Sequence, residues 1–288
     1  MPDQPPPITR ETIASDLARL GIARGDVVFL HSSLKSLGWV EAGAEGVIAA
    51  FLDAVGPEGL LAAPTLTASF ALGCMYRDLV VYAFDPRETS SRVGRITDTL
   101  WRRPDAFRSA HPTHSLAAVG RRAEELVQGH DHTSTFGKDS PYRRLVDWGA
   151  KLVFLGVSLR CNTMLHAIED WLDLPYLRTE QAVVKGPSGE PQVVAVTKSP
   201  MGDRDFYRPG SKVQQLLEKS GLLRRGKVAA ADTMWLPSQD MVRVVVAAIY
   251  EQPDLLLCDR DDCQFCQQWR QPTIDHIRAR ARPLAPMP

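Results

Sequence analysis

Short apolar runs alternate with amphipathic segments along most of the chain. In the first amphipathic segment, apolar side chains recur every three or four positions. Thr9 precedes the segment and Gly21 follows it, and threonine and glycine are common at the beginning and at the end of a helix, respectively. The apolar runs have the length of strands that are buried on both faces of a sheet. The pattern predicts helices at residues 10–20, 44–55, 93–102, 121–128, 163–172 and 239–250. It predicts strands at residues 27–31, 60–63, 116–119 and 151–157, and a hairpin of residues 181–185 and 192–197.

The order of these elements predicts one α/β domain, with a central sheet flanked by helices. Residues 64–89 show no clear period, and long irregular segments in compact domains usually carry function. We expect residues 1–8 to form a flexible leader. Residues 9–288 are expected to form a single domain, whose tail at residues 254–288 contains cysteines.

The charge balance argues against two classes of partner. The 288 residues include 34 lysines and arginines and 34 aspartates and glutamates, which gives no electrostatic preference for nucleic acid or for an anionic membrane. No apolar run approaches the roughly 20 residues of a membrane-spanning helix. The first ten residues carry three consecutive prolines and Asp3 in place of the apolar stretch of a signal peptide. We therefore expect a cytoplasmic protein without nucleic-acid or membrane partners.

A polar loop follows the first predicted strand, which ends at His31. Hydroxyls and backbone N–H groups that lie between a strand and a helix are suited to bind a phosphate group. The loop is neither a P-loop nor a dinucleotide-binding motif, so an ordinary capped loop without a ligand remains the alternative. The loop is rich in such residues, which are Ser32, Ser33, Lys35, Ser36 and Gly38.

Two further segments carry histidines. In HPTHS, His111 and His114 flank Pro112, which favours an extended backbone, so the two rings are expected to face opposite sides. One of them then suits a general base in a cleft, and a structural histidine pair is the alternative. In the helix predicted at residues 163–172, His166 and Glu169 share one face, so the carboxylate can orient a histidine. A surface His/Glu pair is the alternative there.

Three of the five cysteines gather in the tail. Cys258, Cys263 and Cys266 have the spacing C-x4-C-x2-C, and His276 follows them. Four such ligands are what a structural zinc site needs, although the spacing is not that of a standard finger. A reduced CxxC thiol pair or cysteines that only pack the tail are the alternatives.

Taken together, these segments resemble the aminoglycoside 3-N-acetyltransferases, a family of CoA-dependent antibiotic N-acetyltransferases whose fold differs from that of the GNAT enzymes. The matching segments follow the family order over residues 21–175. They are HSSLKSLG, the Pro64–Thr65 pair, FDPRETSSRVGRITDTLWR, RSAHPTHSLAAVG, FGKDSPYRRL and LGVSLRCNTMLHAIE.

The resemblance implies a single α/β domain with a central mixed sheet. It implies an enzyme that transfers the acetyl group of acetyl-CoA to the 3-amino group of an aminoglycoside. The positions that match the family's CoA contacts are Ser32, Ser33, Leu34, Lys35, Gly38, Ser109, Thr113, Phe136 and Gly137.

The resemblance also implies roles in catalysis. His114 matches the position of the general base, and Glu169 with His166 matches the family's LHxxE. Glu169 would orient a histidine or hold the substrate amine, next to Asp170 and Thr163. We expect direct attack of the amine within a ternary complex, so no cysteine nucleophile, and in particular neither Cys74 nor Cys161, is needed.

The sequence leaves more than one acceptor open. Aminoglycosides are polycations, and Glu169, Asp170, Asp173 and Glu180 are expected to line one wall of the acceptor site. The formal net charge of zero means that the protein as a whole has no excess of acidic residues to attract a polycation. A biosynthetic acyltransferase for another amine and a zinc-binding relative without catalysis are therefore the alternatives, and the protein is expected to be a monomer or a homodimer.

Overall fold

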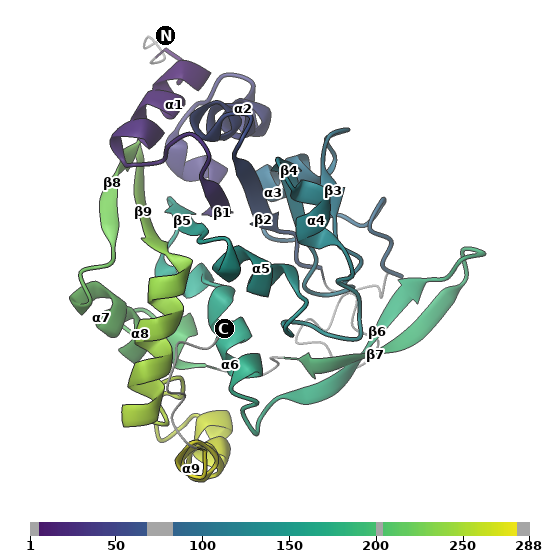
Figure 1. Cartoon of the computed structure of the whole chain (residues 1–288), viewed down its shortest axis with the longest axis vertical. Coiled ribbons are helices and arrows are strands. Elements are labelled where there is room, and N and C mark those ends of the chain that lie inside the picture. Colours follow the sequence, from purple (N-terminus) through teal and green to yellow (C-terminus); the bar gives the residue numbers. More distant parts are fainter. Residues whose placement is uncertain (1–5, 68–82, 200–203, 281–288) are drawn as a thin grey trace.

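A seven-stranded mixed sheet forms the centre of the protein. The computed structural model describes residues 6–67, 83–199 and 204–280 (Figure 1). The strand order in this part of the chain is β3-β4-β2-β1-β5-β9-β8; β2, β1 and β5 are parallel, and the other neighbouring pairs are antiparallel. The strands are β1 (Val27–Ser32), β2 (Leu60–Pro64), β3 (Phe107–Arg108), β4 (Leu116–Gly120), β5 (Lys151–Leu155), β8 (Arg224–Val228) and β9 (Ala231–Pro237).

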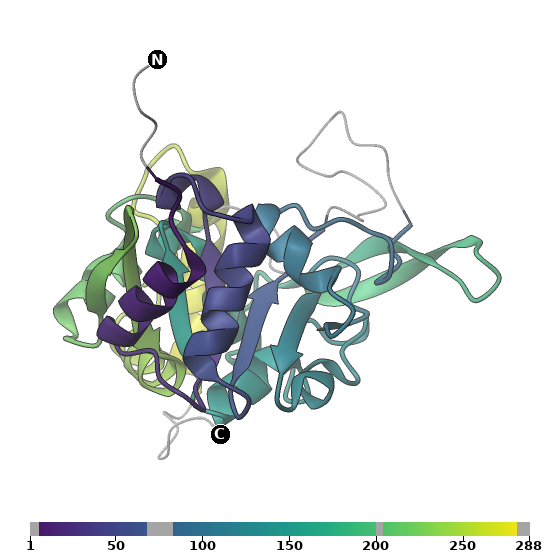
Figure 2. The same cartoon turned by 90° about the horizontal axis from the view of Figure 1, so that it is seen from above.

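Helices cover both faces of this sheet (Figure 2). Side chains alternate along β1, so Val28 and Leu30 join one core while Phe29 joins the other. The first core contains α1 (Arg10–Arg19), α2 (Gly43–Val55) and α3 (Arg95–Trp101). The second contains α4 (Ala123–Val127), α5 (Pro141–Asp147), α6 (Met164–Trp171), α7 (Lys212–Lys219), α8 (Ser238–Glu251) and α9 (Gln264–Arg278).

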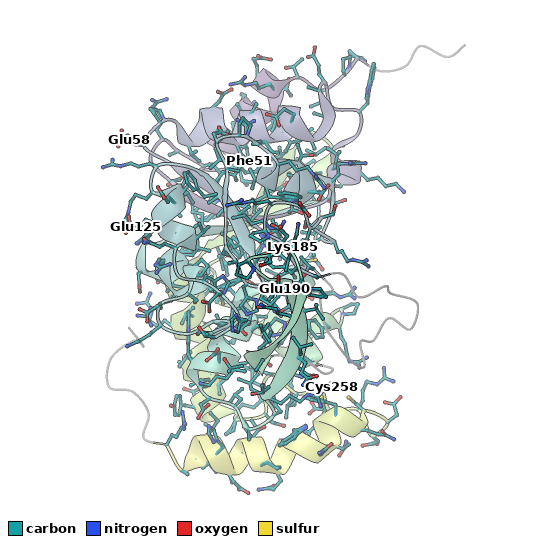
Figure 3. All side chains as sticks on the ribbon, turned by 90° about the vertical axis from the view of Figure 1, so that its right-hand side faces the viewer. Phe51, Glu58, Glu125, Lys185, Glu190 and Cys258 are labelled. Carbon is teal, nitrogen blue, oxygen red and sulfur yellow. The ribbon has the colours of Figure 1, made fainter. Side chains whose placement is uncertain are left out.

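A long hairpin, β6 (Arg178–Lys185) and β7 (Pro191–Ser199), extends from this body as a separate two-stranded sheet (Figures 1 and 2). Lys185 and Glu190, labelled in Figure 3, belong to its outer end. At its base, Thr135 donates a hydrogen bond to the carbonyl of Thr197 at 2.8 Å. The hairpin is therefore anchored to the loop that precedes α5.

The predicted elements and the central mixed sheet are confirmed, with ends that agree to within two residues for most elements. The sequence prediction missed α5, α7, α9, β3 and the hairpin of β8 and β9. Ile8, within the predicted leader, forms a β-bridge with Val40. Cys74 and the middle of the predicted irregular region lie outside the described residues. Among the helices described, none is long and apolar enough to cross a membrane.

Candidate active site

The chemically distinctive segments meet at one edge of the sheet. The carboxyl ends of the parallel strands β1, β2 and β5 lie there, and the HPTHS segment leads into the antiparallel strand β4 at the same edge. Backbone bonds tie the segments together: Ser33 N–H donates to the carbonyl of Leu155 at 2.9 Å, and Thr65 N–H donates to that of Ser115 at 2.8 Å. This edge is where ligands commonly bind in open α/β sheets.

A buried histidine–carboxylate pair lies on α6 at this edge. His166 Nδ1 is 2.5 Å from Glu169 Oε2. The other carboxylate oxygen accepts hydrogen bonds from Arg204 Nε and, at 2.9 Å, from the Tyr176 hydroxyl. Tyr207 OH lies 2.7 Å from His166 Nε2. Glu169 is 0% exposed and His166 is 6% exposed, so the surface-pair interpretation is wrong.

The charge of Glu169 is stabilised inside the protein. Burial alone would raise the pKa of Glu169, but the positive charge of Arg204, and then His166, outweigh burial and lower this pKa below its ordinary value. The carboxylate is therefore ionised near neutral pH. It accepts the Nδ1 proton of His166 and leaves Nε2 as the basic atom, which at rest accepts a bond from Tyr207.

The HPTHS segment forms a turn, so the prediction that its two rings face opposite sides is wrong. His111 Nδ1 accepts hydrogen bonds from the backbone N–H groups of Thr113 and His114, at 3.3 and 3.0 Å. These bonds curl the backbone, and the rings of His111 and His114 meet edge to face at 5.8 Å. His111 is buried and caps the turn, and burial lowers its pKa well below the ordinary value.

His114 is the more accessible of the two histidines. Its Nδ1 lies 2.8 Å from the hydroxyl of the buried Thr113, and its ring meets Phe136 edge to face at 5.3 Å. Burial, followed by the nearby His166 and His130, lowers the pKa of His114 to about 3. The imidazole is therefore neutral near pH 7, and it is a weak base.

Several residues that were predicted to contact CoA already form hydrogen bonds to other parts of the protein. His130 Nε2 donates to the carbonyl of Thr135, so its Nδ1 accepts from the Ser109 hydroxyl at 2.9 Å. That hydroxyl also accepts from Leu116 N–H at 2.9 Å, and Ser109 is buried. Phe136 is fully buried, and its carbonyl accepts from Trp171 Nε1 at 2.7 Å. The Ser109 hydroxyl and the Phe136 carbonyl thus hold the site together.

The loop after β1 keeps polar groups available. Ser33 and Leu34 are partly exposed, and Lys35 and Gly38 are exposed. Buried polar atoms without a hydrogen-bond partner among the described residues gather beside this loop; they are His31 Nδ1, Ser32 Oγ and Asn162 Nδ2. The other ring nitrogen of His31 lies 3.0 Å from Thr163 Oγ1 and links the loop to α6. Such unpartnered groups fit a ligand that brings amide or phosphate groups.

The loop packs tightly against the end of β5. Gly156 has a φ of +64°, and a Cβ built on it would lie 1.7 Å from Ser36 Oγ. Ser36 belongs to η1 (Leu34–Leu37), the short 3-10 helix that follows the two serines. A glycine is therefore required here for both its backbone conformation and its lack of a side chain.

Each acid predicted to line the acceptor wall already has a cationic partner. The pairs are Glu169 with Arg204, Asp170 and Asp173 with Lys198, Asp173 also with Arg280, and Glu180 with Arg178. Glu169 uses both oxygens within the protein and is fully buried. Neither of its oxygens is therefore left free in this structure for a substrate amine.

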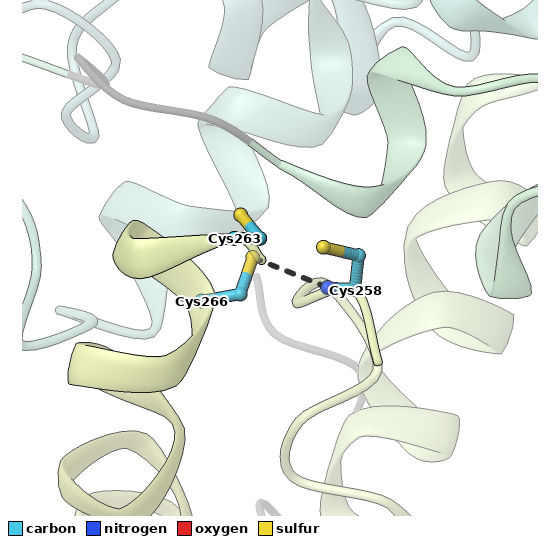
Figure 4. A group of neighbouring side chains, drawn as sticks. All are labelled: Cys258, Cys263 and Cys266. Atoms are coloured by element: carbon cyan, nitrogen blue, oxygen red, sulfur yellow. Dashed lines mark hydrogen bonds between the residues drawn. The ribbon is translucent and has the colours of Figure 1, made fainter. Parts of the chain in front are cut away.

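The three tail cysteines lie together, but the predicted fourth ligand does not join them. The Sγ atoms of Cys258, Cys263 and Cys266 all lie within 4.8 Å of one another (Figure 4). His276 follows Cys266 by ten residues on α9, or about 15 Å along a helix. Its Nε2 bonds instead to the carbonyl of Leu172 at 3.0 Å. The prediction of His276 as a ligand is wrong.

Sequence reasoning missed Arg204, Tyr176 and Tyr207, which surround the pair. Arg204 is fully buried, which is rare for arginine. No local pattern links it to Glu169, because the two are 35 residues apart and are joined only by the fold.

Comparisons with known proteins identify the family of this chain. A family profile described as aminoglycoside 3-N-acetyltransferase matches residues 29–249. The aminoglycoside N(3)-acetyltransferase VII of Streptomyces paromomycinus is 31% identical over 276 residues, which cover 85% of this chain and 93% of that protein.

Solved structures give the same result. AAC-IIIb in a binary complex with CoASH superposes with a TM-score of 0.72 at 28% identity, covering 85% of this chain and 97% of that chain. A histidine-to-alanine variant of AAC(3)-IVa in complex with a gentamicin gives a TM-score of 0.75 at 26% identity, covering 93% and 98%. By sequence and by fold, this chain belongs to the aminoglycoside 3-N-acetyltransferase family.

Proposed function

We propose that this protein transfers the acetyl group of acetyl-CoA to the 3-amino group of an aminoglycoside. The observation that carries the proposal is the buried His166–Glu169 pair, which lies at the ligand-binding edge of the sheet. Membership of the family supports the reaction. The neighbours named as complexes with CoASH and with a gentamicin support both substrates.

The loop after β1 fits acetyl-CoA. The Ser32 hydroxyl and the Asn162 amide are buried without partners among the described residues, as groups awaiting a polar ligand would be. Ser33, Leu34, Lys35 and Gly38 lie beside them on the accessible side of the loop. Acetyl-CoA supplies the acetyl group as a thioester, whose C–S bond breaks as the amine nitrogen bonds to the acetyl carbon.

A structural zinc ion, bound by the cysteines of the tail, is the second bound group that we propose.

The geometry favours His166 over His114 as the general base. An ammonium is not a nucleophile, so the site must first take a proton from it. An ionised Glu169 stabilises the imidazolium that forms on His166, whereas His114 has a pKa of about 3 and only a hydroxyl on its Nδ1. Tyr207 OH bonds to His166 Nε2 and can pass the proton on to it. His114 then has no part in proton transfer and packs against Phe136 beside the pair.

A thiol-release assay with acetyl-CoA tests the proposed reaction. The purified protein is offered a panel of aminoglycosides, and the acetylated position of each product is identified by NMR. We expect thiol release that depends on an aminoglycoside, with the acetyl group on the 3-amino nitrogen. Acetylation of a different amino group, or thiol release that is independent of every aminoglycoside, contradicts the proposal.

A second candidate reaction, acetylation of a less cationic amine, follows from the paired acids. Asp170 and Asp173 both bind Lys198, so a polycationic substrate has to displace this lysine or bind elsewhere. A monoamine of a biosynthetic pathway does not need free carboxylates. The thiol-release assay, together with a measurement of CoA binding, separates the two candidates. If the acceptor is a monoamine, the protein binds CoA but releases no thiol with any aminoglycoside.

A further inference from the structure

We propose that Cys258, Cys263 and Cys266 bind a thiophilic divalent ion such as Zn²⁺, and that this site positions Arg204 against the His166–Glu169 pair through Phe265. The metal site itself does not depend on the proposed function. The second step does, because its readout is catalysis.

The geometry of the three cysteines suits a single ion. A tetrahedral zinc with Zn–S bonds of about 2.3 Å places its sulfur ligands about 3.8 Å apart. The three Sγ atoms already lie within 4.8 Å of one another, and all three residues are buried. Among the described residues, no histidine or carboxylate belongs to the same group.

The surroundings of the cysteines resemble those of a metal–thiolate site. The backbone N–H of Cys258 donates to Cys266 Sγ at 3.2 Å, a bond that stabilises a thiolate (Figure 4). Cys263 is the N-cap of α9, so Cys266 lies in its first turn, where the helix dipole favours negative charge. Arg270, which pairs with Asp254 and Asp259, donates to the carbonyl of Cys258 at 2.6 Å and holds the backbone of this ligand in place.

The cluster connects to the catalytic pair through one aromatic residue. Phe265 lies between two of the ligands in sequence, and the guanidinium of Arg204 is 4.4 Å from the centre of its ring. The same guanidinium is 4.2 Å from the centre of the Tyr176 ring, and Arg204 Nε donates to Glu169. An ion that fixes Cys263 and Cys266 therefore fixes Phe265, and Phe265 holds Arg204 in place. Phe265 and Arg204 are positioning residues.

A second contact joins the tail to the same segment. The backbone N–H of Asp205 donates to the carbonyl of Leu256 at 3.0 Å, two residues before Cys258. Asp205 begins η3 (Asp205–Tyr207), and Tyr207 at its end bonds to His166. Both sides of the His166–Glu169 pair are thus supported by residues next to the cluster.

Metal analysis tests the first step. We expect about one zinc per chain in protein purified without chelator, both for the wild type and for Cys161→Ser, which changes an exposed cysteine outside the cluster. Cys263→Ser and Cys266→Ser are expected to lose more than about nine tenths of the metal. Because a serine variant can fail to fold, Co²⁺ is also added to zinc-stripped wild type, where a thiolate-to-cobalt absorption band is expected. Folded wild type that binds neither ion, or that contains a Cys263–Cys266 disulfide, overturns the proposal.

Phe265→Leu tests the second step, with Gln268→Ala on the exposed face of α9 as the matched control. We expect Phe265→Leu to keep its zinc and to lower kcat about tenfold, with an unchanged KM for acetyl-CoA. The acidic limb of its pH profile should move to higher pH, because a loosened Arg204 stabilises the Glu169 charge less. Phe265→Leu with its zinc bound and with the wild-type kcat and pH profile disproves the coupling. The metal measurement is independent of this result and of the acceptor.

Discussion

The residue that organises the site is Glu169. It is fully buried and ionised, and it binds a fully buried Arg204 on one side and His166 on the other. Removing one member of such a pair leaves the other charge uncompensated in the interior, which costs much more than the pair itself contributes to folding. Glu169 is therefore expected to matter for stability as well as for catalysis.

Glu169→Ala should lower the free energy of unfolding by about 3–5 kcal/mol, because it removes the buried carboxylate that Arg204 and His166 bind. The measurement is urea denaturation at pH 7. Glu125→Ala is the control: it breaks an exposed ion pair with Arg122 and should cost about 1 kcal/mol or less. Glu125 lies on the surface of the protein (Figure 3). Equal costs for the two variants contradict the assigned role of Glu169.

At the residue scale, the sequence predicted part of the site. The spacing of His166 and Glu169 on one helix face was sufficient to pair them. The arrangement of His111 and His114 was not predictable from alternation, because a side chain, His111, bonds to the backbone and makes the turn. Arg204 and Tyr207 carried no signal, since their roles depend on contacts between distant segments.

At the scale of elements, the junction of β5 with η1 determines the position of the loop after β1, which we propose binds acetyl-CoA. Gly156→Ala should destabilise the protein and raise the KM for acetyl-CoA, because the new Cβ collides with Ser36. Thermal denaturation and steady-state kinetics measure the two effects. The left-handed backbone alone costs about 1–2 kcal/mol with an alanine.

Gly149→Ala is the matched control for this prediction. Gly149 has a φ of +68° and nothing within 4 Å of an added Cβ, so it carries the backbone strain without the collision. Ser36→Gly combined with Gly156→Ala should recover most of the difference between the two variants. If Gly156→Ala behaves like Gly149→Ala, the contact with Ser36 is not what demands a glycine.

The elements differ in how well the sequence predicts them, for physical reasons. Buried strands such as β1 and β5 are short continuous apolar runs. Their length separates them from buried helices, which are longer. In contrast, β8 (Arg224–Val228) is mostly exposed and has no apolar alternation, and α9 contains Pro272 and few buried residues. Their places are determined by packing against the rest of the molecule.

At the scale of the whole molecule, four histidines that are largely withdrawn from water determine how the protein responds to acid. Burial is the main cause that lowers the pKa of each one: to about 3 for His31 and His114, to about 4 for His130, and well below the ordinary value for His111. In the unfolded chain these groups bind protons near pH 6.5. The unfolded state therefore binds more protons below this pH, and stability falls as the pH decreases.

We expect the free energy of unfolding to fall as the pH decreases below about 6.5, by at most about 1.4 kcal/mol per pH unit for each of these histidines. Urea titrations at a series of pH values measure this slope. His31→Phe, which keeps an aromatic ring against Phe154, should reduce the slope by about one proton. A stability that is flat over this range shows that these histidines titrate as they do in water.

The most direct test of the account compares two histidine variants in the acetyl-transfer reaction. The kcat of wild type, His166→Ala and His114→Ala is measured with saturating acetyl-CoA and the best aminoglycoside of the panel. We expect a loss of about 10²- to 10⁴-fold for His166→Ala and of less than about tenfold for His114→Ala, with little change in CoA affinity for either. A large loss for His114→Ala with near-normal turnover of His166→Ala contradicts the role of His166 as the general base, and assigns the base to the HPTHS turn.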